Sequence, residues 1–342
     1  MNNDRIQEIL DLMEEARLDY FLISDPQSIA YCTGYYNDPH ERMFVFMISK
    51  HGNHTLFMND LFYLEHDLDV NIVWHKDGQD AIQTIVDEMH FPGRIGIDKN
   101  WASHFLLDLM KKLPDAKYIN ASPCVDLVRM KKDLQEQVLM IESSKINDAV
   151  MEEIIPFIQE GVTEKQLAKK LDELFFNHHS TCYGAIVAFG KNAADPHHEN
   201  DDTPLRKGDC VLIDMGCVYK GYCSDMTRTF FYEGILEEEI KVYEIVKKAN
   251  EAAEAMIKPG VKLSDIDKCA RKVISDEGYG KYFTHRLGHF IGRDVHEYGD
   301  VSSVNEMEVE EGMIFSIEPG IYLEGNFGVR VEDLVMVTKD RC

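Results

Sequence analysis

The stretch CVLIDMGCVYKGYCSDMTRTFF, residues 210–231, reads as two β-strands joined by a turn near Lys220. Asp214 interrupts the first apolar run, and a carboxylate buried in a strand is unfavourable unless it is paired, hydrogen-bonded or bound to a metal. Asp225 lies in the second strand. If the hairpin is centred between Tyr219 and Lys220, the two carboxylates lie directly opposite each other, with Cβ atoms about 5 Å apart. Because like charges opposite each other destabilise a sheet, this stretch predicts a cation between the aspartates.

A second stretch, MIFSIEPGIYLEGNFGVRVEDLVMV at residues 313–337, repeats the arrangement with glutamates. Glu318 follows one apolar run and Glu332 lies in the next, at equal distances from Gly325 in the turn. A hairpin centred on Gly325 would bring the two carboxylates face to face. The alternative is a set of unrelated buried ion pairs, for instance Glu332 with Arg330. A bulge in either hairpin would change its register, so both pairings are hypotheses about geometry.

Three histidines, His285, His289 and His296, occur within the segment THRLGHFIGRDVHE, residues 284–297. A single histidine is most often a structural residue, but three of them together with four suspected buried carboxylates favour a metal site. One histidine and four carboxylates suit two hard or borderline divalent ions such as Mn, Co or Zn. Carboxylates that bridge two such ions hold them roughly 3.5–4 Å apart.

A further segment, VAFGKNAADPHHEND at residues 187–201, contains His197 and His198. The composition of this segment is typical of a loop. One interpretation is an exposed polar loop without a function in catalysis. The other places one of these histidines above the metal pocket.

These segments together resemble the pita-bread metallopeptidases, a family that includes prolidase, Xaa-Pro aminopeptidase and methionine aminopeptidase. The resemblance extends over roughly residues 135–338 and implies an α+β fold with a pita-bread catalytic domain over residues 134–342. It also implies two divalent metal ions, of which Mn is favoured over Co and Zn. Asp225 and Glu332 would be the bidentate or bridging ligands. The five residues that match the metal ligands of the family are Asp214, Asp225, His289, Glu318 and Glu332.

The same resemblance implies a reaction, the hydrolysis of the peptide bond that precedes proline in Xaa-Pro dipeptides or short peptides. Glu318 would accept the proton of the attacking water. His197 and His296 would steer the substrate and stabilise the tetrahedral intermediate. His285 and Arg330 would lie beside the substrate or support the residues that contact it.

Other functions on the same scaffold stay open. An Xaa-Pro aminopeptidase would act on longer peptides, a creatinase-like enzyme would hydrolyse or eliminate at another C–N bond, and a non-catalytic relative would only bind its partner. Relatives of the last two kinds typically lack some of the ligands, whereas this chain has all five positions filled. That difference favours the peptidase.

Three departures from the family pattern concern specificity and length. Phe290 stands where the family usually has glycine after the metal-binding histidine, so we expect it to narrow or reshape the pocket. No arginine follows Glu297 closely, although prolidases often have one there to hold the carboxylate of a dipeptide. The chain ends at Cys342, earlier than the family pattern predicts, so a closing strand is expected to be missing.

Alternating helical and strand-like segments in the first part of the chain predict a smaller α/β domain over residues 1–125. Within it, ISDPQSIAYCTGYYNDPHER at residues 23–42 resembles the N-terminal, creatinase-like domain of bacterial Xaa-Pro dipeptidases. That resemblance implies a homodimer in which His40 and Arg42 contact the substrate across the subunit interface. The alternative is that both residues belong to a solvated polar loop.

The composition excludes several classes of protein. The chain has 36 basic and 61 acidic residues and a formal net charge of −25, which argues against binding to nucleic acid or to an anionic membrane surface. The N-terminus MNNDRIQEIL has no apolar leader, and no segment is long and apolar enough to span a membrane. We therefore expect a cytoplasmic protein in which the eight cysteines are free thiols. Most of the acidic residues are expected to lie on a solvated surface.

Overall fold

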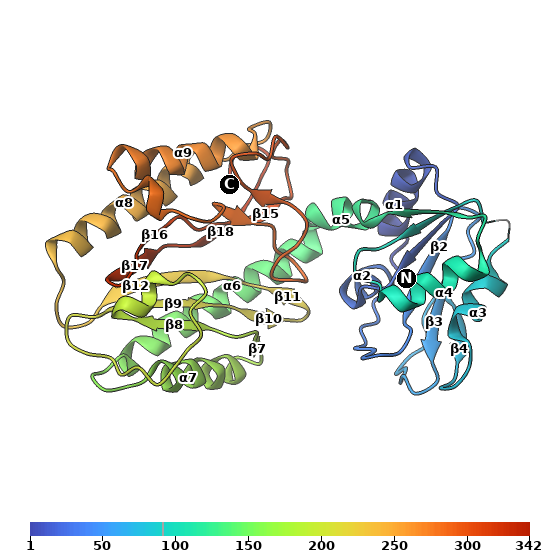
Figure 1. Cartoon of the computed structure of the whole chain (residues 1–342), viewed down its shortest axis with the longest axis horizontal. Helices are drawn as coiled ribbons and strands as arrows, with labels where there is room; N and C mark the ends of the chain where they lie inside the picture. Colours follow the sequence, from blue (N-terminus) through green and yellow to red (C-terminus); the bar gives the residue numbers. More distant parts are fainter. Residues whose placement is uncertain (91) are drawn as a thin grey trace. The chain divides into compact units, whose positions relative to one another are not determined.

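The computed structural model describes residues 1–90 and 92–342, and the chain forms two compact units, Met1–Arg129 and Met130–Cys342 (Figure 1). All eight cysteines are free. Among the described residues, no helix combines the length and the apolar character needed to cross a membrane.

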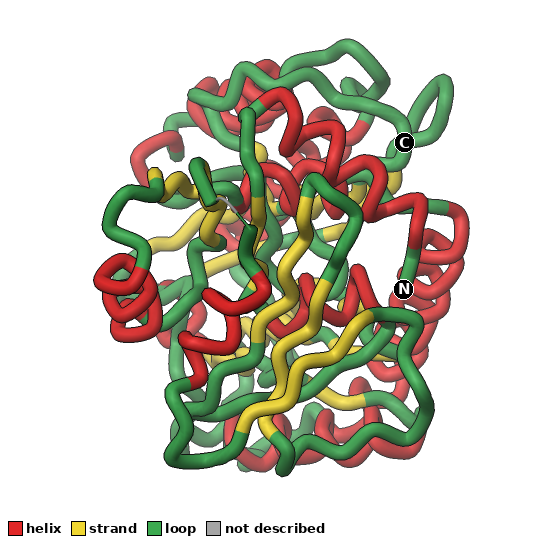
Figure 2. Tube along the Cα trace, turned by 90° about the vertical axis from the view of Figure 1, so that its right-hand side faces the viewer, coloured by secondary structure: helices red, strands yellow, loops and turns green. Residues whose placement is uncertain are grey.

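The N-terminal unit is built on a mixed six-stranded sheet with the strand order β4-β3-β2-β1-β5-β6; in Figure 2, strands are yellow and helices are red. Alternate residues of β1 point to opposite faces of the sheet and belong to two different hydrophobic cores. Phe21 and Ile23 pack with α1 and α2, whereas Tyr20 and Leu22 pack with α3 and α4. Helices therefore cover both faces of the sheet, as the α/β pattern predicts. The elements are α1 (Asn3–Glu15), β1 (Tyr20–Ile23), α2 (Pro26–Thr33), β2 (Val45–Ser49), β3 (Thr55–Asn59), β4 (Asn71–His75), α3 (Ala81–Glu88), β5 (Arg94–Ile97), α4 (Ser103–Lys112), β6 (Lys117–Asn120) and α5 (Ser122–Met130).

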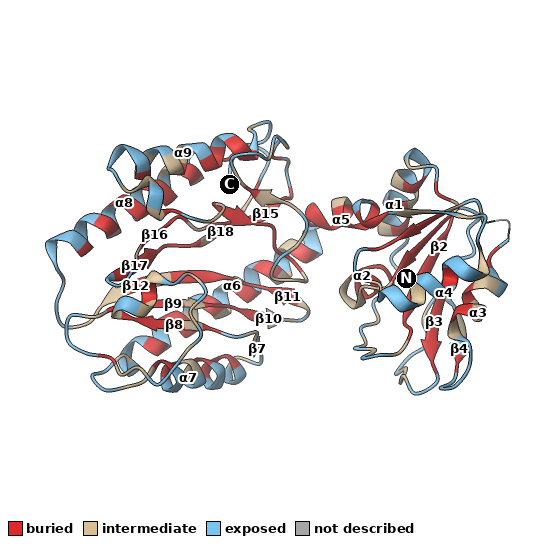
Figure 3. Cartoon of the chain, viewed as in Figure 1, coloured by how far each residue is buried: buried red, intermediate tan, exposed pale blue. Residues whose placement is uncertain are grey.

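The C-terminal unit surrounds antiparallel hairpins with two pairs of helices, which confirms the predicted α+β pita-bread fold. Buried residues of α6 and α7 pack against β8 and β9, while α8 contacts β15, β16 and β17. The strands are largely buried and the outer helix faces are exposed (Figure 3). The helices are α6 (Leu134–Ile154), α7 (Glu164–Asn177), α8 (Glu237–Glu254) and α9 (Leu263–Asp276). The strands are β7 (Thr181–Cys182), β8 (Ile186–Phe189), β9 (Cys210–Met215), β10 (Cys217–Tyr219), β11 (Tyr222–Cys223), β12 (Met226–Phe231), β13 (Gly288–His289), β14 (Asp300–Val301), β15 (Ile314–Ile317), β16 (Gly320–Leu323), β17 (Phe327–Arg330) and β18 (Asp333–Met336).

The glutamate hairpin has the predicted register. Leu323 pairs with Phe327 across the turn at Gly325, and Ile317 pairs with Asp333 farther along. This register is continuous from β16–β17 to β15–β18, so the segments that carry Glu318 and Glu332 lie opposite each other.

The aspartate hairpin has a different register from the predicted one. Lys220 and Gly221 both have positive φ, which is typical of a two-residue type I′ turn, and Tyr219 pairs with Tyr222. The centre of the hairpin is therefore one residue later than we expected. Asp214 pairs with Thr227 rather than with Asp225. Because a partner shifted by two positions keeps the same side of the strand, the two aspartates still share a face.

Candidate metal centre

The two hairpins meet through their acidic residues. The backbone N–H of Glu332 donates to the carbonyl oxygen of Thr227 at 3.1 Å, and the Thr227 hydroxyl donates to Oε2 of Glu332 at 2.7 Å. Glu332 is 1% exposed, so this threonine holds a fully buried carboxylate. The contact joins the Glu332 segment to the strand that begins just after Asp225.

A glycine keeps the space beside the aspartates open. Gly216 follows Asp214 by two positions on the same face, and the register places it across from Asp225. A Cβ atom at Gly216 would lie 1.9 Å from the hydroxyl of Tyr183 and 2.0 Å from the carbonyl oxygen of Ser224, so no larger residue fits there. The tight packing of Tyr183 at this point makes it a wall of the site.

Three of the predicted ligands form a compact donor group. Asp225, His289 and Glu332 each offer a ligand atom within 4.8 Å of the other two, and all three side chains are buried. Nε2 of His289 lies 3.6 Å from Oδ2 of Asp225 and 3.6 Å from Oε1 of Glu318. Imidazole and carboxylate donors at this spacing are suited to a divalent cation.

Asp214 belongs to the same site through Arg330. One guanidinium nitrogen of Arg330 donates to Oδ2 of Asp214 at 2.5 Å, and another donates to the hydroxyl of Tyr322 at 2.9 Å. Arg330 is 2% exposed. The salt bridge therefore offsets the burial of two opposite charges, and it positions Asp214 beside the other acidic residues.

The clustered carboxylates disfavour their own ionisation. Burial raises the pKa of Glu318 to about 7, and the neighbouring Asp214 and Asp225 act in the same direction. Burial and the charges of Asp225 and Glu318 raise the pKa of Glu332 well above its usual value. Burial would lower the pKa of His289, but the adjacent Asp225 and Glu318 raise it. A bound divalent cation would relieve this repulsion, so the donor set fits the metal that the fold implies.

One cavity of about 680 Å³ receives all five predicted ligands together with four of the other predicted residues. Burial lowers the pKa values of His285 and His296 to about 4, so both rings are neutral at pH 7. The ring of His296 lies 4.2 Å from that of His289, and Nε2 of His285 lies 2.8 Å from the hydroxyl of Tyr322. The residues that line the cavity are Tyr183, Gly184, Ile186, Pro196, His197, Asp214, Asp225, His285, Arg286, His289, Val295, His296, Glu318, Arg330 and Glu332.

The sequence interpretation did not identify Glu164, which anchors the loop that carries His197. Glu164 is fully buried and accepts hydrogen bonds from the backbone of Phe189 at 2.9 Å and of Asp201 at 3.0 Å. Nε2 of His198 lies 2.6 Å from the same carboxylate. Glu164, His198 and Asp201 also form a compact donor group, but the oxygens of Glu164 already accept these hydrogen bonds. Its position at the start of α7 gave no sign of this role.

His40 and Arg42 lie in the N-terminal unit. Arg42 forms ion pairs with Asp77 at 2.9 Å and with Glu41 at 2.9 Å, and His40 lies 3.7 Å from Asp38. These contacts are local to the unit. A contact of either residue with substrate stays a prediction.

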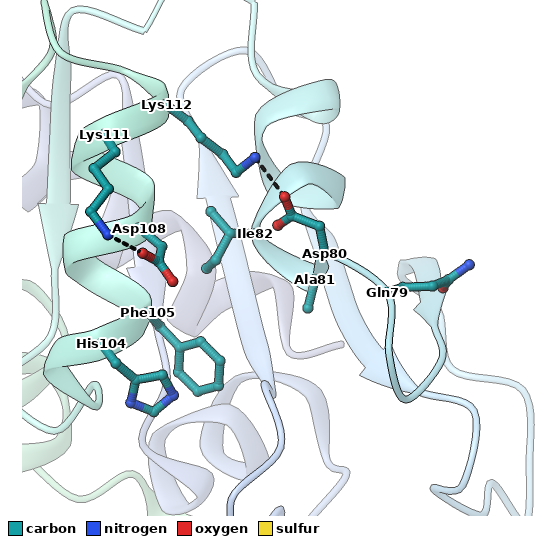
Figure 4. Close-up of a pocket in the computed structure, with 9 residues that line it drawn as sticks. All are labelled: Gln79, Asp80, Ala81, Ile82, His104, Phe105, Asp108, Lys111 and Lys112. Atoms are coloured by element: carbon teal, nitrogen blue, oxygen red, sulfur yellow. Dashed lines mark hydrogen bonds and ion pairs between the residues drawn. The ribbon is translucent and has the colours of Figure 1, made fainter.

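Another cavity, of about 540 Å³, lies between α3 and α4 of the N-terminal unit (Figure 4). Its two lysines are both paired with acidic residues, Lys111 with Asp108 at 2.7 Å and Lys112 with Asp80 at 2.6 Å. These pairs leave no uncompensated lysine charge to attract a ligand. We assign this cavity no function.

Phe290 does not line the metal cavity, contrary to our expectation that it narrows or reshapes the pocket. Its fully buried ring packs against the ring of Phe315 with centroids 5.3 Å apart. A Cβ atom at Gly299 would lie 2.8 Å from the Phe290 ring, so the backbone also approaches closely there. Side chains of successive extended residues point to opposite sides, which directs His289 into the cavity and Phe290 into the core.

Phe290→Ala is therefore expected to lower the free energy of unfolding by about 3–5 kcal/mol, as removal of a buried aromatic ring does. Urea denaturation followed by circular dichroism measures this change. The matched control is Phe176→Ala, because Phe176 is 77% exposed and its loss should change stability by less than about 0.5 kcal/mol. Equal small effects of the two substitutions would contradict the core position of Phe290.

The metal-free protein is expected to lose stability as the pH rises from about 6.5 to 8.5. The folded state raises the pKa values of Glu318 and Glu332, so it binds more protons than the unfolded chain in this range. His285 and His296 act in the opposite direction, but only below the unfolded pKa of about 6.5. Thermal unfolding of chelated protein across this range measures the decline. A thermal unfolding midpoint that rises with pH would contradict this prediction. The midpoint of the metal-loaded protein should fall less over the same pH range.

Comparisons with known proteins match both units of the chain to known protein families. Residues 138–339 match metallopeptidase family M24, and residues 5–131 match the creatinase/prolidase N-terminal domain. An uncharacterised peptidase of Staphylococcus aureus is 34% identical over 98% of this chain and 97% of its own length.

Solved structures show the same likeness. A dipeptidase from Pyrococcus horikoshii is 36% identical with a TM-score of 0.92, over 98% of this chain and 96% of that protein. The Xaa-Pro dipeptidase from Bacillus anthracis is 29% identical with a TM-score of 0.91, over 98% and 95%. With its two matched domains and its cluster of buried metal-type donors, the chain belongs to metallopeptidase family M24.

Proposed function

We propose that this metallopeptidase hydrolyses the peptide bond that precedes proline, with Xaa-Pro dipeptides as its main substrates. The observation that carries the proposal is the convergence of five donor residues and two neutral histidines on one cavity. The likeness to dipeptidases over nearly the whole chain supports the substrate class.

We propose that Asp214, Asp225, His289, Glu318 and Glu332 hold two divalent ions, with Mn favoured over Co and Zn. The gathering of four carboxylates on one cavity supports metal binding, because divalent cations offset clustered negative charge, whereas Arg330, within the described residues, pairs with Asp214 alone. When bound, such ions supply Lewis acidity and make a water molecule acidic enough to attack at neutral pH.

The side chains of the cavity supply the proton acceptor and the hydrogen-bond donors of the reaction. Glu318 lines the cavity beside His289 and accepts the proton that the attacking water loses. His296 is neutral, so a ring N–H can donate to the oxyanion that develops on the substrate carbonyl. His197 lines the same cavity and belongs to the loop that Glu164 holds in place. We assign His197 the role of a second hydrogen-bond donor to the oxyanion.

The supporting contacts explain how these groups keep their orientation. Ser316 donates from its hydroxyl to Oε1 of Glu318 at 3.2 Å, and the same hydroxyl accepts from the backbone of His289 at 3.0 Å. His285 lies against Tyr322, which also accepts a hydrogen bond from Arg330. We infer that His285 and Arg330 orient the ligands and the cavity wall.

The test compares the hydrolysis of Ala-Pro, Ala-Pro-Ala and Ala-Ala by protein loaded with Mn or Co, with bound metal quantified in the same samples. Turnover of Ala-Pro above the other two supports the proposal. Preferential turnover of Ala-Pro-Ala would indicate an aminopeptidase. If two metals are bound and none of the peptides is cleaved, the peptidase proposal is refuted.

We also propose that the protein is a cytoplasmic homodimer in which His40 and Arg42 reach the partner's substrate. The match of residues 5–131 to the creatinase/prolidase N-terminal domain supports this arrangement. Light scattering after size-exclusion chromatography tests the dimer. Arg42→Ala should raise KM without changing metal content, and a monomer with full activity would refute the assignment.

A further inference from the structure

Two cysteines face each other across neighbouring strands of the C-terminal unit. Cys182 of β7 and Cys217 of β10 are direct partners in the antiparallel register. The backbone of Cys217 is directed away from β7, because its carbonyl oxygen accepts from the N–H of Ser224 at 2.9 Å and its N–H donates to the Ser224 hydroxyl at 3.3 Å. Cys182 and Cys217 are therefore a non-hydrogen-bonded pair, in which the Cα atoms lie about 4.5 Å apart and the side chains are closer than in a hydrogen-bonded pair.

Both side chains lie on the face of the strands that packs against helices. Residues directly opposite each other on antiparallel strands share a face. Sγ of Cys217 lies 3.6 Å from the hydroxyl of Ser143 in α6, and both cysteines pack into the core that α6 and α7 form with β8 and β9. Tyr183, the residue after Cys182, lines the metal cavity on the opposite side. A bond between the two sulfurs would therefore form outside the cavity and would displace none of its residues.

The register of this pair meets the requirement for a disulfide. Disulfides join residues whose Cα atoms are about 4.4–6.8 Å apart, so a non-hydrogen-bonded pair needs little movement of the backbone. Both cysteines are free thiols in the structure. Cys182 is half-buried, whereas Cys217 is fully buried, so a small oxidant reaches Cys182 first.

We propose that Cys182 and Cys217 form an oxidation site, at which hydrogen peroxide converts two thiols into one reversible disulfide. The sulfur of Cys182 attacks a peroxide oxygen, the O–O bond breaks and one water leaves, which gives a sulfenic acid. The sulfur of Cys217 then attacks the sulfur of Cys182, the S–O bond breaks and a second water leaves. In total the two thiols lose two electrons and two protons, and one hydrogen peroxide is reduced to two molecules of water.

The disulfide would close a loop of the chain that contains residues of the metal cavity. His197 and Asp214 both lie between Cys182 and Cys217 in the sequence, so the bond would oppose unfolding of the segment that carries them. Burial raises the pKa of the Cys182 thiol to about 12, so little thiolate is present at neutral pH and the oxidation is slow. The site therefore responds to sustained rather than brief exposure to peroxide.

The test treats the whole chain with hydrogen peroxide in the presence of a chelator, blocks the remaining thiols with N-ethylmaleimide and maps disulfides by mass spectrometry of a non-reduced digest. We expect a linkage between Cys182 and Cys217 that dithiothreitol removes. The midpoint of thermal unfolding should be roughly 5–15 °C higher before dithiothreitol than after it, because the disulfide constrains the unfolded chain. Absence of the linkage, or pairing of either cysteine with a different one, would overturn the proposal.

Cys182→Ser removes one sulfur at a half-buried position and should abolish the difference in midpoint that dithiothreitol reveals. The matched control is Cys269→Ser, which removes another half-buried cysteine of the same unit and should keep both the linkage and the difference. A full difference in Cys182→Ser would overturn the proposal. If Cys182→Ser does not fold, the linkage and the midpoints of the wild type decide the question. None of these measurements uses peptide hydrolysis, so they test this inference separately from the proposed function.

Discussion

Glu318→Gln is expected to reduce kcat for Ala-Pro by about 10²–10⁴-fold, the range that a positioned general base contributes. The substitution keeps the shape of the side chain and its contact with Ser316, but an amide cannot accept the proton of the attacking water. Steady-state kinetics at saturating Mn measure the loss. KM should change much less than kcat, because the substitution removes an interaction of the transition state.

The control for this substitution is Glu324→Gln in the exposed turn of the same hairpin. It removes the same charge from the protein and should leave kcat unchanged. Activity of Glu318→Gln close to that of wild type would show that another group accepts the proton, and it would refute the role assigned to Glu318.

Asp225→Asn is expected to lower both metal content and activity, with a loss of rate of roughly 10³-fold. Asp225 is part of the donor group with His289 and Glu332, and it lies 3.6 Å from Nε2 of His289. A neutral amide replaces a charged donor there, which weakens the binding of a hard cation. Elemental analysis of dialysed protein, alongside turnover of Ala-Pro, measures both effects.

The choice of Asp225 rather than Asp214 separates metal loss from unfolding. Asp214→Ala would leave the buried guanidinium of Arg330 without its salt bridge, which is expected to destabilise the fold by about 3–5 kcal/mol. Asp225→Asn keeps the side-chain oxygen that accepts from the backbone of Met226 at 3.1 Å. Full metal occupancy in Asp225→Asn would contradict the ligand assignment.

The two hairpins show why a sequence predicts some pairings and not others. Glu318 and Glu332 came out opposite each other because their hairpin continues in one register past the turn at Gly325. The aspartate pair was displaced because Lys220 adopts a positive φ, which a lysine seldom does, and so joins Gly221 in the turn. The predicted closeness of the two aspartates still holds, because side chains two positions apart on a strand point to the same face.

The positions of Arg286 and Phe290 depend on contacts between segments far apart in the chain. Phe290 and Phe315 come together only when β13 packs against β15. Nothing in the local pattern around Arg286 distinguishes an arginine that faces a cavity from one that faces solvent. Burial of this kind is a property of the assembled layers and has no signature in a short stretch of sequence.

By itself, the sequence predicted the α+β class, the two-domain order and the two pairs of acidic residues, because hydrophobic periodicity and charged residues inside apolar strands are local properties. The resemblance to the pita-bread family added the histidines that line the same cavity. Only the tertiary structure decided that Arg330 pairs with Asp214, that Thr227 holds Glu332 and that Arg286 shares their cavity. The first two contacts join residues that are about a hundred positions apart in the chain. They form only when the two hairpins pack against each other.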